Sequence, residues 1–444
     1  MDYKELTQDL VRQCMRRGAD AAEVYLETGR NLNVSVRNGE METVQENAAQ
    51  GVGFRVIVNG RLGFAHSNDL SEASLKATLK SAINFAKILS PESYNVLPSD
   101  SATATVEGLY DEAIAQVPLD KKIELAKETE RLAMKDRRIT QSAGASYSEG
   151  EGEVFLANSN GLAKSYRSAA CAYGVSVVAE KGDQKCTGGE FCSRRFFADL
   201  KAPEEVAKKA AREAYEMLDP RMIRTQRAAV IFDPSVARAI LGGVLGALNG
   251  ERVVQGASFL GGKLGEAIAS SQVTLVDDGL KPKGLASAPF DGEGVATQRR
   301  TVVEKGVLKG YLYNTIAAHR AGVESTGNAS RGGFTALPGI GPHNFYMAAG
   351  DLDPQEIIRS TRQGLFLKGI TGYGINAVNG NFSGGASGFW IENGRIVHPV
   401  KGVTIAGTAF EMLMGIDRVG NDLDPHSTFT APTFRIAEMQ IGGE

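Results

Sequence analysis

Alternating apolar and polar residues that end in Asn-Gly pairs constrain the fold of this chain more than any other feature. Apolar side chains alternate with polar ones over residues 32–36, and Asn38-Gly39 follows. Residues 52–58 repeat the pattern ahead of Asn59-Gly60. A period of two is typical of half-buried strands, and Asn-Gly is favoured in two-residue hairpin turns. The first part of the chain is therefore predicted to be an antiparallel meander.

Apolar positions spaced three and four residues apart predict helices among the strands. Helices are expected at about 3–17, 71–89, 119–135, 203–218 and 234–248, strands over 139–195 and 228–232, and short helical pieces near 314–321, 353–361 and 407–416. This segregation indicates the α+β class, with an N-terminal α/β layer that holds the meander and a C-terminal, strand-rich mixed domain with a few helices. The break Leu218-Asp219-Pro220 predicts two domains, 1–220 (with a central segment of about 118–220) and 221–444.

Composition and charge argue against several classes of function. The formal net charge is −3, which gives no overall basic footprint for nucleic acid. No run of about 18 apolar residues is present for a membrane span, and the N-terminal segment lacks the apolar core of a signal peptide. The four cysteines are too few and too irregularly spaced for a disulfide framework. We therefore expect a cytoplasmic protein with reduced thiols that binds neither nucleic acid nor membranes.

The histidines do not form a local metal motif. A zinc protease of the zincin type needs two histidines one helical turn apart with a glutamate beside them, so that both imidazoles reach one ion. The closest two of the five histidines here, His319 and His343, are 24 positions apart, and the cysteines form no Cys-x-x-Cys pair. We expect no catalytic residue and no metal ligand in this chain. A zinc site assembled from distant residues stays open as an alternative.

The sequence contains two other groups of nucleophilic or acidic residues. Gly385-Ala386-Ser387-Gly388 does not fit the Gly-x-Ser-x-Gly elbow of serine hydrolases. Paired carboxylates occur at Asp277-Asp278 and at Asp291 with Glu293. Two acids of this kind can share a proton or a metal, but acids in glycine-flanked segments more often cap turns, and we favour capping here.

One long C-terminal segment carries a family signature. Residues 376–394 read Asn-Ala-Val-Asn-Gly-Asn-Phe-Ser-Gly-Gly-Ala-Ser-Gly-Phe-Trp-Ile-Glu-Asn-Gly, and Thr404-Ile-Ala-Gly407 and Gly420-Asn-Asp422 follow. Phe290-Asp-Gly-Glu-Gly294 forms a second block upstream. These segments resemble the TldD/PmbA (TldE) family, and the resemblance extends over nearly the whole chain.

The resemblance implies one half of a two-part protease. One subunit, TldD, carries His-Glu-x-x-x-His on a helix and a cysteine near its C-terminus, which together hold zinc, whereas TldE or PmbA lacks these ligands. The two form a heterodimer that digests unfolded peptides. The family is linked to maturation of a peptide antibiotic, to removal of an antitoxin and to altered sensitivity to gyrase poisons, hence the description "modulator of DNA gyrase".

The ligand positions place this chain on the PmbA side. The helix expected after strand 228–232 contains no histidine or glutamate over 238–250, and Val419-Gly-Asn-Asp422 stands where the catalytic subunit has its cysteine. The resemblance therefore implies a subunit that is inactive alone and has no cofactor, with zinc in a TldD-like partner. In isolation a homodimer is also compatible with the family's fold.

The glycine-rich block is the candidate binding segment. Its small residues let another backbone come close, so an extended peptide or a partner could add as a strand. The positions are Asn379, Phe382, Ser383, Gly384, Gly385, Ala386, Ser387 and Gly388. A tight structural turn in the core explains the block equally well. Trp390 and Ile391 are expected in the core.

Two other classes of function remain open. The chain could be a stand-alone hydrolase that uses Asp291, Glu293, His343 or His398. It could also be a peptide-binding regulatory module without a protease. Cleavage that depends on a single residue would favour the first, and a catalytic partner that never co-purifies would favour the second.

Overall fold

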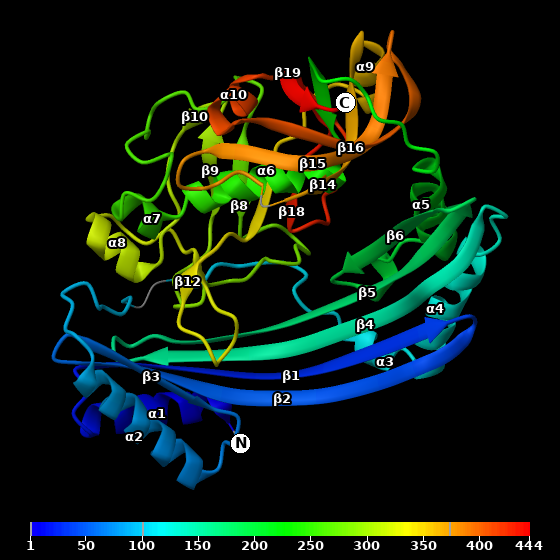
Figure 1. Cartoon of the computed structure of the whole chain (residues 1–444). Coiled ribbons are helices and arrows are strands. Elements are labelled where there is room, and N and C mark those ends of the chain that lie inside the picture. Colours follow the sequence, from blue (N-terminus) through cyan, green and yellow to red (C-terminus); the bar gives the residue numbers. More distant parts are fainter. Residues whose placement is uncertain (1, 100–101, 373) are drawn as a thin grey trace.

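The protein consists of a long curved sheet and a strand-rich C-terminal half that lies over its concave face (Figure 1). The structure is a computed structural model that describes residues 2–99, 102–372 and 374–444. The observed mixture of helices and antiparallel strands confirms the predicted α+β class.

The curved sheet contains the predicted meander. Its strands follow the order β3-β2-β1-β4-β5-β6 and each pairs antiparallel with its neighbour. Their bounds are β1 (Ala21–Arg37), β2 (Glu40–Val58), β3 (Arg61–Ser67), β4 (Ile139–Asn158), β5 (Ala163–Lys181) and β6 (Gln184–Arg194). Both residues of Asn38-Gly39 and of Asn59-Gly60 have positive φ, the backbone that a type I′ hairpin turn requires.

Helices cover the convex face of this sheet at both ends (Figure 1). At one end, α1 (Tyr3–Arg16) and α2 (Glu72–Ile88) pack on Val24 and Leu26 of β1. At the other end, α4 (Leu119–Ala133) and α5 (Pro203–Glu216) pack on Leu32, Val34 and Val36. These five residues are all even-numbered, so they share one face of the strand. The odd-numbered face of β1 is left for the C-terminal half.

Strand β2 differs from the half-buried strand that its sequence predicts. Residues 51–58 are buried throughout, with even-numbered side chains under α1 and α2 and Arg55 against the C-terminal half. Residues 40–50 are instead exposed throughout. The two ends of one strand therefore have different environments, because only one end lies beneath the second half of the protein.

The C-terminal half is built on a closed ring of five strands. The ring runs β16-β15-β14-β7-β19 and closes because β16 also pairs with β19. Its members are β7 (Gln226–Phe232), β14 (Gln363–Thr371), β15 (Asn381–Glu392), β16 (Arg395–Thr408) and β19 (Phe434–Gly442), with β17 (Ile416–Val419) attached to β19. Apolar side chains from the ring and from α6 (Pro234–Ala247) form one core.

A second sheet completes this core on the other side of α6. Its order is β10-β9-β8-β13-β18, and its strands span Val307–Leu308, Arg299–Glu304, Leu275–Asp278, Asn344–Met347 and Phe429–Thr430, respectively. The remaining elements are α3 (Ala113–Gln116), a 3-10 turn (Phe197–Asp199), α7 (Gly250–Val254), α8 (Thr315–Ala321), β11 (Ala329–Ser330), β12 (Gly339–Ile340), α9 (Pro354–Arg359) and α10 (Ala409–Met414). Within the described residues, none of the helices is long and apolar enough to cross a membrane.

Candidate functional site

The residues expected to bind a peptide or partner lie on β15 and in the turn before it. Asn379 and Ser383 are exposed, Gly385 and Ser387 are half-buried, and four are buried, namely Phe382, Gly384, Ala386 and Gly388. Strand β15 is paired with β14 on one edge and with β16 on the other. Over Gly385–Glu392 both edges are occupied, so an added strand has no free edge to join there.

Close backbone contact explains part of the glycine content. A Cβ atom on Gly388 would lie 2.0 Å from the carbonyl oxygen of Phe366 on β14, far inside van der Waals contact. Trp390 and Ile391 are buried in the C-terminal half, as predicted. The block is therefore part of the ring's architecture, and its solvent-facing residues are the ones open to a binding role.

Two bulges open the glycine-rich strand onto a cavity. The pairing of β14 with β15 skips Lys368, and the pairing of β15 with β16 skips Ser387. Bulges redirect side chains out of the regular alternation. Lys368 and Ser387 both line a cavity of about 450 Å³, whose other walls are residues from β6, α5, α6 and β14. Those other residues are Thr187, Glu213, Met217, Ser235, Val236, Arg238, Ala239, Gly369 and Ile370.

An ion pair fixes one wall of this cavity. Lys368 Nζ lies 2.9 Å from Asp233 Oδ2, and Asp233 also caps α6 by accepting a hydrogen bond from the backbone N–H of Ser235. Burial opposes ionisation of Asp233, but the charge of Lys368 and these hydrogen bonds outweigh it and lower the pKa of the carboxyl. The ammonium of Lys368 is therefore already neutralised by Asp233.

Glu213 of α5 is the unpaired acid of the cavity. Its side chain has no hydrogen bond or ion pair with any described residue, and its burial raises the pKa of the carboxyl above the ordinary glutamate range, although the charges of Lys368 and Lys209 oppose the rise. A perturbed acid in a cavity is a common feature of functional sites.

A buried charge network joins the two parts of the protein. Arg55 of β2 lies 2.5 Å from Glu23 of β1 and 2.7 Å from Glu293 of the C-terminal half. Glu23 also pairs with Arg331, whose Nε donates to the carbonyl oxygen of Gly292. The two arginines and two glutamates alternate in sign, so each charge buried there is matched.

The predicted carboxylate pair lies at this junction, but the two acids have separate partners. Asp291 accepts hydrogen bonds from the backbone N–H groups of Glu293, Val295 and Ala329, which confirms the predicted turn-capping role. Burial and the neighbouring charge of Glu293 raise the pKa of Asp291, and the three N–H donors oppose this. Glu293 is instead ion-paired with Arg55 at 2.7 Å.

His343 and Asp291 line a second cavity, of about 250 Å³, between the curved sheet and the C-terminal half. The Nδ1 atom of His343 lies 3.3 Å from the buried carboxylate of Asp277, which also accepts a hydrogen bond from the backbone N–H of His343. His398, the other histidine of the hydrolase alternative, lies on β16 opposite Trp390. The structure thus brings Asp291 and His343 to one cavity, whereas Glu293 is paired with Arg55 and His398 lies apart.

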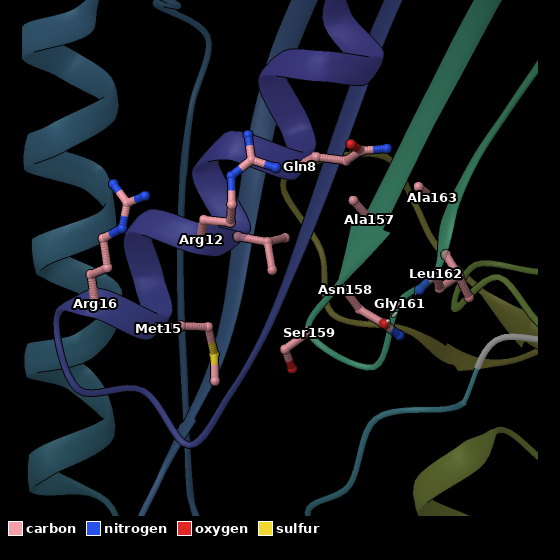
Figure 2. Close-up of a pocket in the computed structure, with 11 residues that line it drawn as sticks. Gln8, Arg12, Met15, Arg16, Ala157, Asn158, Ser159, Gly161, Leu162 and Ala163 are labelled. Atoms are coloured by element: carbon pink, nitrogen blue, oxygen red, sulfur yellow. Dashed lines mark hydrogen bonds between the residues drawn. The ribbon is translucent and has the colours of Figure 1, made fainter.

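A third opening lies between α1 and the turn that joins β4 to β5 (Figure 2). It measures about 550 Å³ and its lining includes Arg12, Met15 and Arg16 of α1 and Ser159 of the turn. None of the residues that line this groove is an acid, and the predicted binding segment contributes nothing to it. It offers no acid–base pair for chemistry.

The side chains of α6 include none of the usual zinc ligands. Over Pro234–Ala247 the helix has no histidine, glutamate or cysteine. Throughout residues 2–99, 102–372 and 374–444, no three or more His, Cys, Asp or Glu side chains are grouped in a way that could hold a metal ion. Zinc in proteins is bound by the side chains of Cys, His, Asp and Glu, and this helix supplies none of them.

The charged residues of the cavity beside Ser387 and those of the buried network at Arg55 were not identified from the sequence. Glu213, Lys368, Arg55 and Glu23 were not singled out, although two of them carried a signal. Arg55 stands within the apolar run 51–58, and Glu23 interrupts the apolar run 21–26. A charge inside a run that is otherwise apolar indicates a buried ion pair.

Comparison with known proteins places this architecture in one family. Models of the PmbA/TldA metallopeptidase domain 1, central domain and C-terminal domain match residues 22–86, 112–218 and 225–443. The chain is 33% identical to Metalloprotease PmbA of Escherichia coli O157:H7, with 96% of this chain and 93% of that protein covered. It is 32% identical to the Metalloprotease PmbA homolog of Haemophilus influenzae, with 100% and 96% covered.

Solved structures agree with these matches. TldE from Thermococcus kodakarensis superposes with a TM-score of 0.90 at 26% identity and covers 98% of this chain and 99% of its own. A protein named as a modulator of DNA gyrase, from Bacteroides thetaiotaomicron, gives a TM-score of 0.92 at 27% identity, with both chains covered completely. On its sequence and over its whole length, this chain belongs to the PmbA/TldA metallopeptidase family.

Proposed function

We propose that this chain is the non-catalytic, PmbA/TldE-like subunit of a TldD-type zinc metalloprotease that acts on unfolded peptides. One observation carries the proposal: the chain has the complete family fold, yet α6 lacks the histidines and glutamate that would bind zinc and activate water. Zinc and the catalytic groups would then come from a TldD-like partner. By resemblance to the family, this protease would act in peptide maturation, in the turnover of an antitoxin and in sensitivity to gyrase poisons.

The partner is proposed to form a heterodimer with this chain in the cytoplasm, and the isolated chain to be inactive, either as a monomer or as a homodimer. All four cysteines are free thiols, in keeping with a reducing compartment. The chain would help to shape the peptide site, and its contribution to rate would come from binding and positioning.

Reconstitution tests this division of labour. The purified chain is assayed for zinc by elemental analysis and for cleavage of an unfolded peptide, alone and with a partner that carries His-Glu-x-x-x-His. We expect neither zinc nor cleavage from the chain alone, and cleavage when both are mixed. The matched control is the same partner with its motif glutamate replaced by glutamine. Stoichiometric zinc and cleavage by this chain alone would refute the proposal.

A second candidate, the stand-alone hydrolase, is favoured by one observation. Asp291 and His343 line the same cavity, and Asp277 holds the imidazole of His343 in place. If the chain alone cleaves a substrate, His343→Asn should abolish that activity while the protein stays folded. His398→Asn is the control, because His398 lies on the ring and away from this cavity.

A further inference from the structure

We infer that the cavity beside Ser387 binds the ammonium or guanidinium group of a lysine or arginine side chain, with Glu213 as the carboxylate that receives it. The inference rests on the proposed function, because unfolded peptides would supply that side chain. It adds to the proposal a preference for basic residues in the peptide, encoded by this subunit and not by the zinc-binding one.

The charges around the cavity leave Glu213 without a partner. Lys368 is paired with Asp233 at 2.9 Å, and Lys209, one turn before Glu213 on α5, is paired with Glu190 at 2.9 Å. Glu213 itself has no ion pair or hydrogen bond with the described residues and is only partly accessible to water. A partly buried carboxylate without a partner is unfavourable, and a bound cation would relieve this cost.

The other walls suit a long basic side chain. Met217, Val236 and Ile370 offer apolar surface for a methylene stem, and the hydroxyls of Thr187 and Ser387 can accept hydrogen bonds from a cationic head group. A volume of about 450 Å³ falls in the range of small-ligand sites, roughly 300–1,000 Å³. Methylene stem and charged head are therefore both accommodated.

An anionic ligand fits the cavity less well. Its two cations are Lys368, already neutralised by Asp233, and Arg238, whose side chain is exposed to solvent, which screens its charge. The N-terminal N–H groups of α6 are also occupied, since Asp233 accepts from Ser235, Val236 and Ala237. An anion would have to displace existing partners, whereas a cation would find Glu213 free.

Two peptides that differ at one side chain test the inference. A fluorescent Gly/Ser-rich peptide with a single lysine is compared with the same peptide carrying norleucine, which keeps the methylene stem but has no charge. By fluorescence anisotropy at pH 8, the full-length chain should bind the lysine peptide about tenfold more tightly, the value of one charge-assisted hydrogen bond. The preference should weaken at lower pH, as Glu213 becomes protonated.

Substitutions assign the preference to Glu213. Glu213→Gln should reduce the discrimination to about twofold or less, since the amide keeps the shape and loses the charge. Glu216→Gln is the matched control, because Glu216 lies on the same helix and pairs with Arg212. This variant should still bind the lysine peptide about tenfold more tightly than the norleucine peptide. Thermal unfolding followed by circular dichroism verifies that each variant is folded.

Three results would overturn the inference: equal binding of the two peptides by the wild-type chain, no binding of either, or full discrimination in Glu213→Gln. Cleavage of the norleucine peptide in the presence of the zinc-binding partner separates this failure from failure of the proposed function. If cleavage depends on the partner but the chain shows no preference for lysine, only the cation site is refuted. If adding the partner produces no cleavage, the proposed function is refuted, whatever the binding data show.

Discussion

Arg55 and Glu293 form an ion pair at 2.7 Å although they are 238 positions apart, and both side chains are almost completely buried. Arg55 belongs to the curved sheet and Glu293 to the C-terminal half. Glu293 also accepts a hydrogen bond from the backbone N–H of Thr315, the first residue of α8. The pair therefore ties the sheet to a helix terminus of the other half and fixes the orientation of one against the other.

Replacing one partner of this network should destabilise the protein strongly. Arg55→Met should lower the free energy of unfolding by about 3–5 kcal/mol, because two buried glutamates lose their shared counter-ion. Urea unfolding followed by circular dichroism measures the change. The control is Arg30→Met on the neighbouring strand, whose pair with Glu46 is exposed and should contribute about 1 kcal/mol or less. Similar losses for the two variants would show that the buried network has no special role.

Two glycines of β2 face Phe334, and a change at Phe334 should compensate for the substitution of one of them but not of the other. A Cβ on Gly51 would lie 2.3 Å from the far end of the Phe334 ring, whereas a Cβ on Gly53 would lie 2.4 Å from the Phe334 carbonyl oxygen. Each single Gly→Ala change should destabilise by about 1–3 kcal/mol. Adding Phe334→Leu, which removes the ring atoms, should rescue Gly51→Ala but not Gly53→Ala. Thermal unfolding midpoints of the four variants decide this, and equal rescue would contradict it.

The glycines of β15 should fall into structural and tolerant positions. Gly388→Ala should prevent correct closure of the ring, since its Cβ would collide with the backbone oxygen of Phe366 at 2.0 Å. Gly385→Ala should be mild, because its nearest neighbour, at 2.4 Å, is the movable hydroxyl of Thr371. Soluble yield and thermal midpoint measure both. A stable Gly388→Ala variant would mean that the glycine serves binding and not the fold.

Much of the architecture was predictable because it is encoded locally. The hairpin turns at Asn38-Gly39 and Asn59-Gly60 and the ends of α1, α5 and α6 follow from turn residues, capping and apolar spacing, and the helix bounds agree with expectation to within two residues. Closure of the ring by β16 and β19, in contrast, depends on pairing between distant segments that leave no local pattern.

The candidate site was predictable only in part for the same reason. The glycine-rich segment drew attention to Ser387, but the cavity beside it needs Glu213 of α5 and the two bulges, which are set by tertiary packing. Asp291 was expected to cap a turn and does so. The pairing of Glu293 with Arg55 could not be inferred. Arg55 lies on a strand that was expected to be half-buried, and only the assembled fold shows which face of this strand meets the C-terminal half.

Stability should depend on pH through Glu213. Burial raises the pKa of this carboxyl in the folded protein, so the folded state binds the proton more tightly than the unfolded state does. Stability therefore falls as the pH rises from the ordinary glutamate range through the folded pKa, and the penalty is complete above it. Glu213→Gln should raise the unfolding midpoint at pH 8, and the difference should vanish near pH 4. A lower midpoint for the variant at pH 8 would show that the carboxylate is stabilised in the free protein.

The ring of the C-terminal half also sets a time order for biosynthesis. Strand β7 opens this half, but its partner β19 ends at Gly442, and the backbone of Glu444 is hydrogen-bonded to Ile223 and Thr225. Domains usually fold as they emerge from the ribosome. Strand β19 follows the other four ring strands in the sequence, so a nascent chain carries an open sheet with an unpaired β7 edge until β19 has been made and has left the exit tunnel. Emergence of β19, and not synthesis of any earlier ring strand, is the event that allows the ring to close.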